Sequence, residues 1–363
     1  MTKRLIIFNP SIEDGGVEKN LFLIANYLAN KIPSLIVITS SIDKKKFFSK
    51  KIVLSTIYFK LFDSFKRYPK YFFCVFLLIF NIIRYKRKVA VLAFQANIYA
   101  IIVSKLLSVK IITRSNTSPY GWNKSLIKQS IFKFFFKKTD LIIVNSFEFK
   151  KQMDKVYSIK SKVILNPFDF NHIKNKSFEN VENNFFRKNN LKLINVGRLV
   201  DQKDQITILK AIKLVFKKNK NVQLIIVGKG EKETELNNYI SRNKLENYIK
   251  LVGYQDNPFK YIRTADLFIL SSKYEGLPNA LIESMFLKKS VISTDCPTGP
   301  KEILDNGNYG SLFKVGDYKS LAKLILNFKK NKKKIKNNFL SCSRYDYQNN
   351  CEEYFKTIKP YLK

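Results

Sequence analysis

Short apolar runs recur along the chain, and the stretches between them carry apolar residues at helical spacing. A first series of runs occupies residues 4–8, 34–39, 89–94, 110–113, 141–145 and 162–166. A second series occupies residues 191–197, 222–228, 249–253, 267–272, 290–294 and 310–315. Strands that are apolar almost throughout are typical of parallel sheets covered on both faces. The pattern therefore predicts the α/β class, with two doubly wound, Rossmann-like domains.

A polar, Asn-rich segment that follows Pro167 separates the two series and predicts a linker. A length of 363 residues suits two domains, and a hydrophobic fraction of 45% is enough for two cores. The predicted parts are an N-terminal domain at 1–167, a linker at 168–190, a second domain at 191–340 and a C-terminal helix at 341–363. The basic run 329–338 is expected to be a solvated helix end or a short linker.

The loop after the first strand contains Gly15 and Gly16 and leads into a helical pattern. Ligands of doubly wound sheets bind beyond the carboxyl ends of the strands, so this loop is a candidate binding element. Bare glycine backbone at a helix amino terminus can hold an anion. The simpler interpretation is a plain Gly-Gly turn, because the dinucleotide-binding spacing of glycines is absent.

The corresponding loop of the second half reads GRLVDQK. Gly197 allows a tight turn, and Arg198 and Lys203 could converge on a diphosphate together with helix amide dipoles. In so basic a chain, two cations at this spacing are also expected as ordinary solvated charges.

A third loop places two carboxylates eight positions apart, Glu275 in the loop and Glu283 in the following helix. The backbone between them is expected to cradle a phosphate at the helix start. The residues of this cradle are Gly276, Leu277, Pro278, Asn279 and Ala280. The alternative for such a pair is a solvent-facing helix carboxylate that favours the helix dipole.

With these loops the chain resembles a retaining glycosyltransferase of family 4, of the bacterial surface-polysaccharide type. Glu275 and Glu283 match the E-x7-E motif of that family, and Arg198 and Lys203 match its basic diphosphate loop. Further matches in family order are DGGVE at the glycine-rich loop, VNSFE, LNPFD and CPTGPKEIL. The likeness runs over most of the chain.

The resemblance implies the GT-B fold, in which two Rossmann-like domains face a central cleft and a C-terminal helix crosses back to the N-terminal domain. It implies that Glu283 holds the nucleotide ribose, that Glu275 faces the donor sugar, and that Arg198 and Lys203 neutralise the diphosphate. The two glycine loops would then belong to the donor site. No metal and no other cofactor are expected, since the sequence has no D-x-D pair.

One departure from the family concerns histidine. Many relatives carry a histidine near the reacting carbon, whereas here the single His172 falls in the predicted linker. The loop after residues 110–113 offers Arg114 and Asn116 as acceptor-side candidates. Because an amide is neither an acid nor a base at neutral pH, no catalytic base is assigned.

The expected activity is transfer of a hexose or N-acetylhexosamine from a nucleotide-diphosphate sugar, with UDP as the expected nucleotide. The acceptor is expected to be a lipid-linked glycan or a polysaccharide, as in lipopolysaccharide or capsule synthesis. Two alternatives stay open: a sugar-nucleotide epimerase on the same fold, and a nucleic-acid-binding protein suggested by the net charge of +38 alone. No nucleic-acid-binding motif supports the latter, so no nucleic acid partner is expected.

The positive charge also suits an anionic membrane surface, although an AT-rich coding bias would enrich lysine as well. Residues 66–88 and 124–140 are basic and aromatic, and the apolar run in 66–88 falls short of the ~20 residues that span a bilayer. We expect 66–88 to pack on the first sheet and 124–140 to contact a membrane. The expected location is cytoplasmic, peripheral at the inner face of the cytoplasmic membrane.

The four cysteines show neither metal-ligand spacing nor a disulfide pattern. They are Cys74, Cys296, Cys342 and Cys351. A reducing compartment is therefore expected, and the first 16 residues are expected to be a strand and loop, without a secretory signal.

Overall fold

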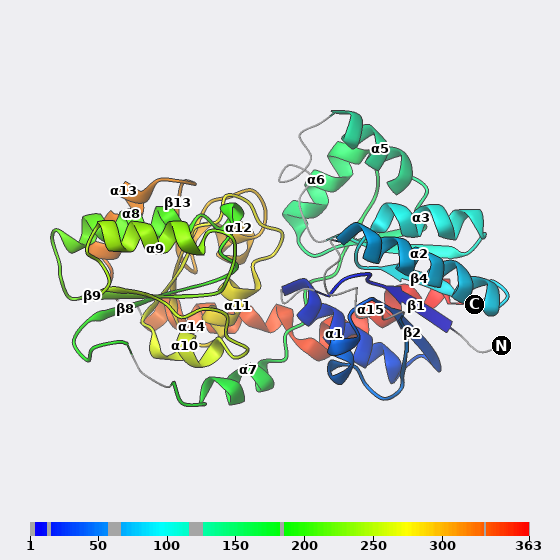
Figure 1. The fold of residues 1–363 in the computed structure, drawn as a ribbon, viewed down its shortest axis with the longest axis horizontal. Coiled ribbons are helices and arrows are strands. Elements are labelled where there is room, and N and C mark those ends of the chain that lie inside the picture. Colours follow the sequence, from blue (N-terminus) through cyan, green and yellow to red (C-terminus); the bar gives the residue numbers. More distant parts are fainter. Residues whose placement is uncertain are drawn as a thin grey trace. The chain divides into compact units, whose positions relative to one another are not determined.

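The chain forms two compact units, which are seen in a computed structural model (Figure 1). The structure describes residues 4–12, 16–56, 67–115, 126–181, 185–329 and 332–362. Unit 1 comprises Met1–Phe168 and Tyr345–Lys363, and unit 2 comprises Asp169–Arg344. Each unit has its own sheet and its own core, so the prediction of two doubly wound α/β domains is confirmed.

Unit 1 is built on a parallel sheet with the strand order β3-β2-β1-β4-β5-β6-β7. The strands are β1 (Arg4–Phe8), β2 (Ser34–Ile38), β3 (Ile52–Ser55), β4 (Ala90–Ala93), β5 (Lys110–Arg114), β6 (Leu141–Val144) and β7 (Lys162–Val163). All described pairings are parallel, with Leu5 opposite Leu35 on one side and Ala90 on the other. The predicted runs became strands, and only β3, a short run that follows two lysines, was missed.

Helices cover both faces of the first sheet. One face packs against α1 (Gly16–Ala29) and α15 (Tyr347–Ile358). The other face packs against α2 (Arg67–Arg84), α3 (Asn97–Leu106), α5 (Leu126–Phe136) and α6 (Phe147–Tyr157). A 3-10 helix, η1 (Ile42–Phe47), follows β2. Alternate residues of each strand therefore enter two separate cores, as the continuous apolar runs require.

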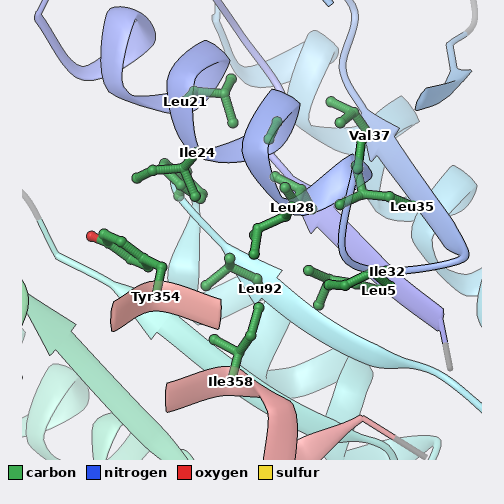
Figure 2. Packing of buried hydrophobic residues seen from close by; sticks show 14 of the residues in the cluster. Leu5, Leu21, Ile24, Leu28, Ile32, Leu35, Val37, Leu92, Tyr354 and Ile358 are labelled. Atoms are coloured by element: carbon green, nitrogen blue, oxygen red, sulfur yellow. The ribbon is translucent and has the colours of Figure 1, made fainter. Parts of the chain in front are cut away.

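The last helix, α15, completes the core of unit 1. Figure 2 shows its Ile358 pointing toward Leu92 of β4, and its Tyr354 belongs to the same core as Leu28 of α1. All four side chains are fully buried. A hydrogen bond of 2.6 Å from Tyr27 Oη to Glu352 Oε2 also joins α1 to α15. The C-terminal segment thus packs as part of unit 1, although it follows the whole of unit 2 in sequence.

A buried arginine ties α15 to the sheet. Arg114, at the end of β5, is fully buried, and its Nε donates to Tyr354 Oη at 2.8 Å. Its Nη2 donates to Asn166 Oδ1 at 2.6 Å, and its guanidinium lies 5.1 Å from the centre of the Phe94 ring. Burial raises the pKa of Tyr354, so this residue remains a neutral phenol.

Unit 2 contains the second parallel sheet, in the order β10-β9-β8-β11-β12-β13. Its strands are β8 (Leu191–Val196), β9 (Val222–Val227), β10 (Ile249–Leu251), β11 (Leu267–Leu270), β12 (Ser290–Thr294) and β13 (Ser311–Phe313). Each lies within one of the predicted runs. The strands run from β8 outward to β10 and then resume on the other side with β11, so the order reverses between β8 and β11.

Helices of unit 2 also form two layers, which Figure 1 shows above and below β8 and β9. One layer consists of α8 (Gln205–Phe216), α9 (Glu233–Arg242) and α13 (Tyr318–Leu326). The other contains α10 (Phe259–Thr264), α11 (Asn279–Phe286) and α14 (Lys332–Ser341), with α7 (Phe170–Ser177) against α10. The short elements of unit 2 are α12 (Pro300–Ile303), η3 (Asp201–Lys203), η4 (Asp305–Gly307) and most of η5 (Cys342–Tyr345). In unit 1, η6 (Lys359–Tyr361) follows α15.

Two segments predicted as linkers belong to unit 2. Within residues 168–190, α7 packs on the unit, and the Phe170 ring stacks on Phe286 at 4.3 Å. Within 329–338, the described part belongs to α14, where Ile335 and Asn338 are buried. The linker prediction for 168–190 was wrong because Phe170 finds a partner far away in the chain. The run 329–338 does contain a helix end, the start of α14 at Lys332, but Ile335 and Asn338 are buried and not solvated.

All four cysteines are free and buried, which agrees with the expected lack of disulfides among them. Desolvation raises the pKa of the Cys74 and Cys342 thiols to about 12. These thiols are therefore small apolar core groups.

The contact between Arg114 and Tyr354 predicts a loss of stability on deletion of one hydroxyl. Tyr354→Phe leaves the buried Nε–H of Arg114 without this acceptor, which we expect to destabilise unit 1 by about 1–3 kcal/mol. Urea unfolding and amide exchange of α15 would measure the change. The control is Tyr361→Phe at a partly buried ring, and equal effects of the two changes would contradict the role of the hydroxyl.

Candidate active site

Three loops meet at the carboxyl edge of the second sheet. They follow β8, β11 and β12, which are neighbours in the sheet. The reversal of strand order lies between β8 and β11, and such a point is where open α/β sheets bind ligands. The loops after β8 and β11 contain Arg198, Lys203 and Glu275, so the structure brings together these sequence-predicted residues.

An ion pair joins the first two loops. Lys203 Nζ lies 2.6 Å from Glu275 Oε1, and the exposed fractions of the two side chains are 18% and 6%. Ser272 Oγ donates to the same carboxylate oxygen at 2.6 Å. A carboxylate this deeply buried requires such compensation, because water no longer solvates its charge.

Backbone groups hold the two loops in register. Gln202 Nε2 donates to the carbonyl of Tyr274 at 2.8 Å, and the amide of Lys273 donates to the carbonyl of Gln202 at 2.8 Å. Ser271 Oγ donates to the carbonyl of Lys203 at 2.7 Å. The position of the Lys203 ammonium is therefore determined by hydrogen bonds on both sides of η3.

The loop after β12 supports the Glu275 backbone. The amide of Glu275 donates to the carbonyl of Pro297 at 3.3 Å, and Thr298 Oγ1 donates to the carbonyl of Glu275. Gly299 follows with a φ of +86°, a conformation that L-residues with a side chain rarely adopt. A Cβ at this position would lie 2.6 Å from the carbonyl oxygen of Gly276.

Two buried amides at β8 were not found by the sequence reasoning. Asn195 lies near the end of β8, two residues before Gly197. Its Nδ2 donates to the carbonyl of Ile269 in β11 at 2.8 Å. Gln205 Nε2 donates to the carbonyl of Arg198 at 3.0 Å. The available signal for Asn195 was a polar residue between the apolar Ile194 and Val196 near the end of β8, and a buried polar side chain needs a partner of this kind.

The helix α11 carries the second predicted carboxylate. Pro278 precedes its first residue, Asn279, so the proline lies just outside the first turn in which it was predicted. Glu283 is 4% exposed and lies in the second turn. The solvent-facing alternative for Glu283 therefore does not hold. Gly276, Leu277 and Pro278 of the predicted cradle are buried, whereas Asn279 and Ala280 are partly exposed.

Two ionisable groups near the ion pair are desolvated. Burial raises the pKa of the Cys296 thiol to about 12, and the charge of Glu275 contributes in the same direction. Burial also raises the pKa of Asp204, whose carboxylate accepts a hydrogen bond of 2.7 Å from Thr207 Oγ1. Arg198, in contrast, is exposed at the rim of the same loop.

The two acceptor-side candidates, Arg114 and Asn116, are not placed at a site by the structure. Arg114 is fully buried against Tyr354 and Asn166, so its predicted role in contacting an acceptor does not fit its position. Asn116 and Gly15 lie outside the described residues, and Gly16 is the first residue of α1.

The first sheet has its own reversal point, between β1 and β4. Amide side chains gather at the carboxyl ends of these strands: Gln95 Oε1 accepts from the Ser11 amide at 3.3 Å, and Asn9 Nδ2 donates to the Ser11 carbonyl at 3.0 Å. Sequence reasoning missed these residues because each follows its strand singly, without a motif.

The described residues contain no group of three or more His, Cys, Asp and Glu side chains that could hold a metal ion. The site in unit 2 thus consists of cations, carboxylates, hydroxyls and backbone groups. Such a set can bind an anion through Arg198 and Lys203 and can accept hydrogen bonds from hydroxyl groups through the two glutamates.

The packing around Gly299 predicts that a side chain at this position destabilises unit 2. Gly299→Ala would combine a left-handed backbone with a Cβ 2.6 Å from Gly276 O and 2.8 Å from Pro278 Cδ. We expect it to destabilise unit 2 by more than the ~1–2 kcal/mol of backbone strain alone. The control, Gly316→Ala, has a similar φ of +77° and open space around its Cβ. Thermal unfolding would compare the two, and equal losses would contradict the steric argument.

Comparison with known proteins identifies the domain that carries this site. Residues 176–341 match the family described as glycosyl transferases group 1. An uncharacterized glycosyltransferase of Methanocaldococcus jannaschii is 39% identical over 178 residues, which cover 48% of this chain and 44% of that protein. The chain therefore spans about half the length of the curated relatives it matches.

A second relative comes from Campylobacter jejuni subsp. jejuni. It is the N-acetylgalactosamine-N,N'-diacetylbacillosaminyl-diphospho-undecaprenol 4-alpha-N-acetylgalactosaminyltransferase. It is 28% identical over 221 residues, which cover 59% of this chain and 58% of the relative.

The fold is similar to that of Anabaena HepE, whose crystal structure contains UDP and glucose. The TM-score is 0.79 at 19% identity, and the match covers 99% of this chain and 100% of HepE. The family match and the structural similarity both point to a glycosyltransferase fold with two parallel sheets. The chain has the GT-B fold, and its residues 176–341 match the glycosyl transferases group 1 family.

Proposed function

We propose that the protein is a retaining glycosyltransferase of family 4 that transfers a hexose or N-acetylhexosamine from a UDP-linked donor. The acceptor is a lipid-linked glycan or a polysaccharide of a bacterial surface. The observation that carries this proposal is the buried Lys203–Glu275 pair at the reversal point of the second sheet, with the buried Glu283 on the helix that follows.

The cations of the site suit a diphosphate leaving group. When the glycosidic bond breaks, negative charge grows on the departing diphosphate, and Arg198 and Lys203 would stabilise that charge together with the amide dipoles at the start of α11. Such groups act more strongly on the transition state than on the ground state. The proposed reaction needs no metal ion and no other cofactor.

Lys203 has to change its partner during this reaction. In the structure its ammonium contacts Glu275 Oε1, which also accepts from Ser272. A bound diphosphate offers Lys203 a stronger anion, while Glu275 keeps the Ser272 hydroxyl and gains a donor-sugar hydroxyl. Each buried charge would remain compensated throughout, which avoids the large cost of an unpaired charge.

Glu283 is proposed to hold the ribose. A buried carboxylate has two oxygens and no hydrogen to donate, so it suits a pair of neighbouring hydroxyl groups. Its 4% exposure keeps competing water away, which strengthens those hydrogen bonds.

Retention of configuration is proposed to proceed on one face of the sugar. The acceptor oxygen forms a bond to the anomeric carbon from the side on which the diphosphate leaves, while the bond from that carbon to the phosphate oxygen breaks. The acceptor proton passes to the departing diphosphate. No side chain is assigned as the base, and the scheme differs from the two-carboxylate arrangement of retaining hydrolases.

The relatives support the choice of substrates. The name of the Campylobacter relative describes a sugar transferred to an undecaprenyl-diphosphate-linked glycan, and HepE was crystallised with UDP. By analogy we propose a polyprenyl-linked acceptor and a location on the cytoplasmic side of the membrane, where nucleotide sugars occur.

Glu283→Gln tests the assignment of the nucleotide site. The change removes the charge of the proposed ribose acceptor, and we expect UDP to bind at least about tenfold more weakly with the fold intact. Calorimetry with UDP would measure it. The control is Glu235→Gln, at an exposed helix carboxylate with only a surface ion pair to Lys232. Unchanged UDP affinity in Glu283→Gln would contradict the proposed site.

Lys203→Met separates the role of the cation in stability from its role in catalysis. Alone, the change leaves the buried Glu275 carboxylate without its counter-ion and should lower both stability and kcat. The double variant Lys203→Met with Glu275→Gln removes both charges, so stability should recover while kcat for UDP-sugar turnover stays at least about tenfold low. Recovery of kcat together with stability would mean that the pair has only a structural role.

A further inference from the structure

Three neighbouring helices of unit 1 present apolar side chains outward. The helices α2, α3 and α5 contact one another in sequence over the same face of the first sheet (Figure 1). Their inner sides fill the core, as the helical periodicity predicts. The outer sides of helices that face water are ordinarily polar, whereas here they expose many large apolar side chains as well.

The longest outward stripe is on α2. Phe72, Phe76, Phe80 and Ile83 are 72%, 60%, 51% and 58% exposed. These positions recur every three or four residues, so they share one side of the helix. The opposite side of α2 is buried in the core. The segment is therefore apolar around its whole circumference, which is unusual for a helix at the surface of a soluble domain.

The stripe continues onto the neighbouring helices. The Tyr71 ring of α2 packs edge-on against Tyr99 of α3 at 6.4 Å. Nine of the 17 exposed large hydrophobic side chains among the described residues lie on these three helices. They are Phe72, Phe76, Phe80, Ile83, Tyr99, Leu106, Ile127, Ile131 and Phe134. We call this set the aromatic face. Clustering of this kind marks an interaction surface, whereas single exposed apolar residues do not.

The charged residues within the three helices are all cations. The sequences of α2, α3 and α5 contain no Asp or Glu. Exposed cations follow the helices directly, at Arg84, Lys86, Arg87 and Lys88 after the α2 stripe and at Lys137 and Lys138 after α5. The Lys138 ammonium lies 4.7 Å from the centre of the Phe134 ring, so a cation borders the apolar surface directly.

The carboxylate that follows α5 is already compensated. Asp140, which follows α5, accepts from Lys105 at 2.7 Å and from Lys110 at 2.9 Å. Backbone and lysine hydrogen bonds lower its pKa despite partial burial, so it stays ionised and paired. The surface as a whole therefore keeps a net positive charge.

We propose that the aromatic face docks on an anionic lipid bilayer. Aromatic and aliphatic side chains between cations match the boundary between acyl chains and acidic head groups. No described helix is long and apolar enough to cross a membrane. The helices would lie along the interface with their outer side chains inserted.

This inference specifies the surface through which the proposed enzyme would meet a lipid-linked acceptor, and so it rests on the proposed function. It also changes the expectation for residues 66–88. That segment was expected to pack on the first sheet and 124–140 to contact the membrane, whereas both α2 and α5 do the former with one side and expose apolar residues on the other.

Vesicle binding tests the docking surface without any substrate. The full-length protein is mixed with sedimentable vesicles of phosphatidylcholine alone or of phosphatidylcholine with phosphatidylglycerol. We expect preferential binding to the anionic vesicles, reduced by high salt. The variant Phe72→Ser with Phe76→Ser should weaken partitioning at least about tenfold.

A matched variant controls for the loss of two exposed rings. Phe47→Ser with Phe178→Ser removes rings that are 46% and 57% exposed and lie outside the aromatic face, and it should bind vesicles as the unmodified protein does. A second variant, Lys137→Glu with Lys138→Glu, should lose the preference for anionic lipid while leaving the apolar stripe intact. Circular dichroism verifies that each variant folds.

Three outcomes would overturn the proposal. They are equal binding by the two double-Ser variants, equal binding of the unmodified protein to neutral and anionic vesicles, and a dimer in light scattering that Phe72→Ser with Phe76→Ser converts to a monomer. The last would assign the aromatic face to a second copy of the chain. UDP binding to unit 2 is measured separately, so failure of the membrane proposal and failure of the nucleotide site are distinguishable.

Discussion

The reversal of strand order between β8 and β11 is the constraint on which the site depends. It makes two loops that are about 70 residues apart in sequence leave the sheet side by side. The Lys203–Glu275 ion pair then joins the two loops, with 2.6 Å between Lys203 Nζ and Glu275 Oε1. A carboxylate and an ammonium held in this way are oriented before any ligand arrives, which is the form of preorganisation that electrostatic catalysis requires.

Local pattern predicted most of the strands because a parallel strand is apolar on both faces, whatever its partners are. The spacing of Glu275 and Glu283 and the basic loop likewise identified residues that the structure buries or brings together. The direct ion pair was not predictable from spacing, since Lys203 and Glu275 were expected to face different parts of a donor. It depends on which loops the topology makes adjacent, and that is a property of the whole sheet.

The wrong sequence predictions also concern contacts between segments that are far apart in the chain. Arg114 looked like a free cation after a strand, but Tyr354, 240 residues later, gives its guanidinium a buried partner. The segment 168–190 looked like a linker until Phe286 supplied a surface for Phe170. For α2, periodicity correctly predicted the buried side, but the same sequence could not show that the other side also remains apolar and open to solvent. Each error concerns a partner that is remote in sequence.

The helix α15 also constrains the order in which the protein can form. During synthesis, residues 169–344 leave the ribosome before residues 345–363 do, so every part of unit 2 is available before unit 1 has all of its chain. Until α15 arrives, Leu28 and Leu92 lack the cover that Tyr354 and Ile358 provide, and Arg114 lacks the Tyr354 hydroxyl. Unit 1 is thus completed only after unit 2 has been synthesised, and the surface that α15 covers stays exposed until residues 345–363 have left the ribosome.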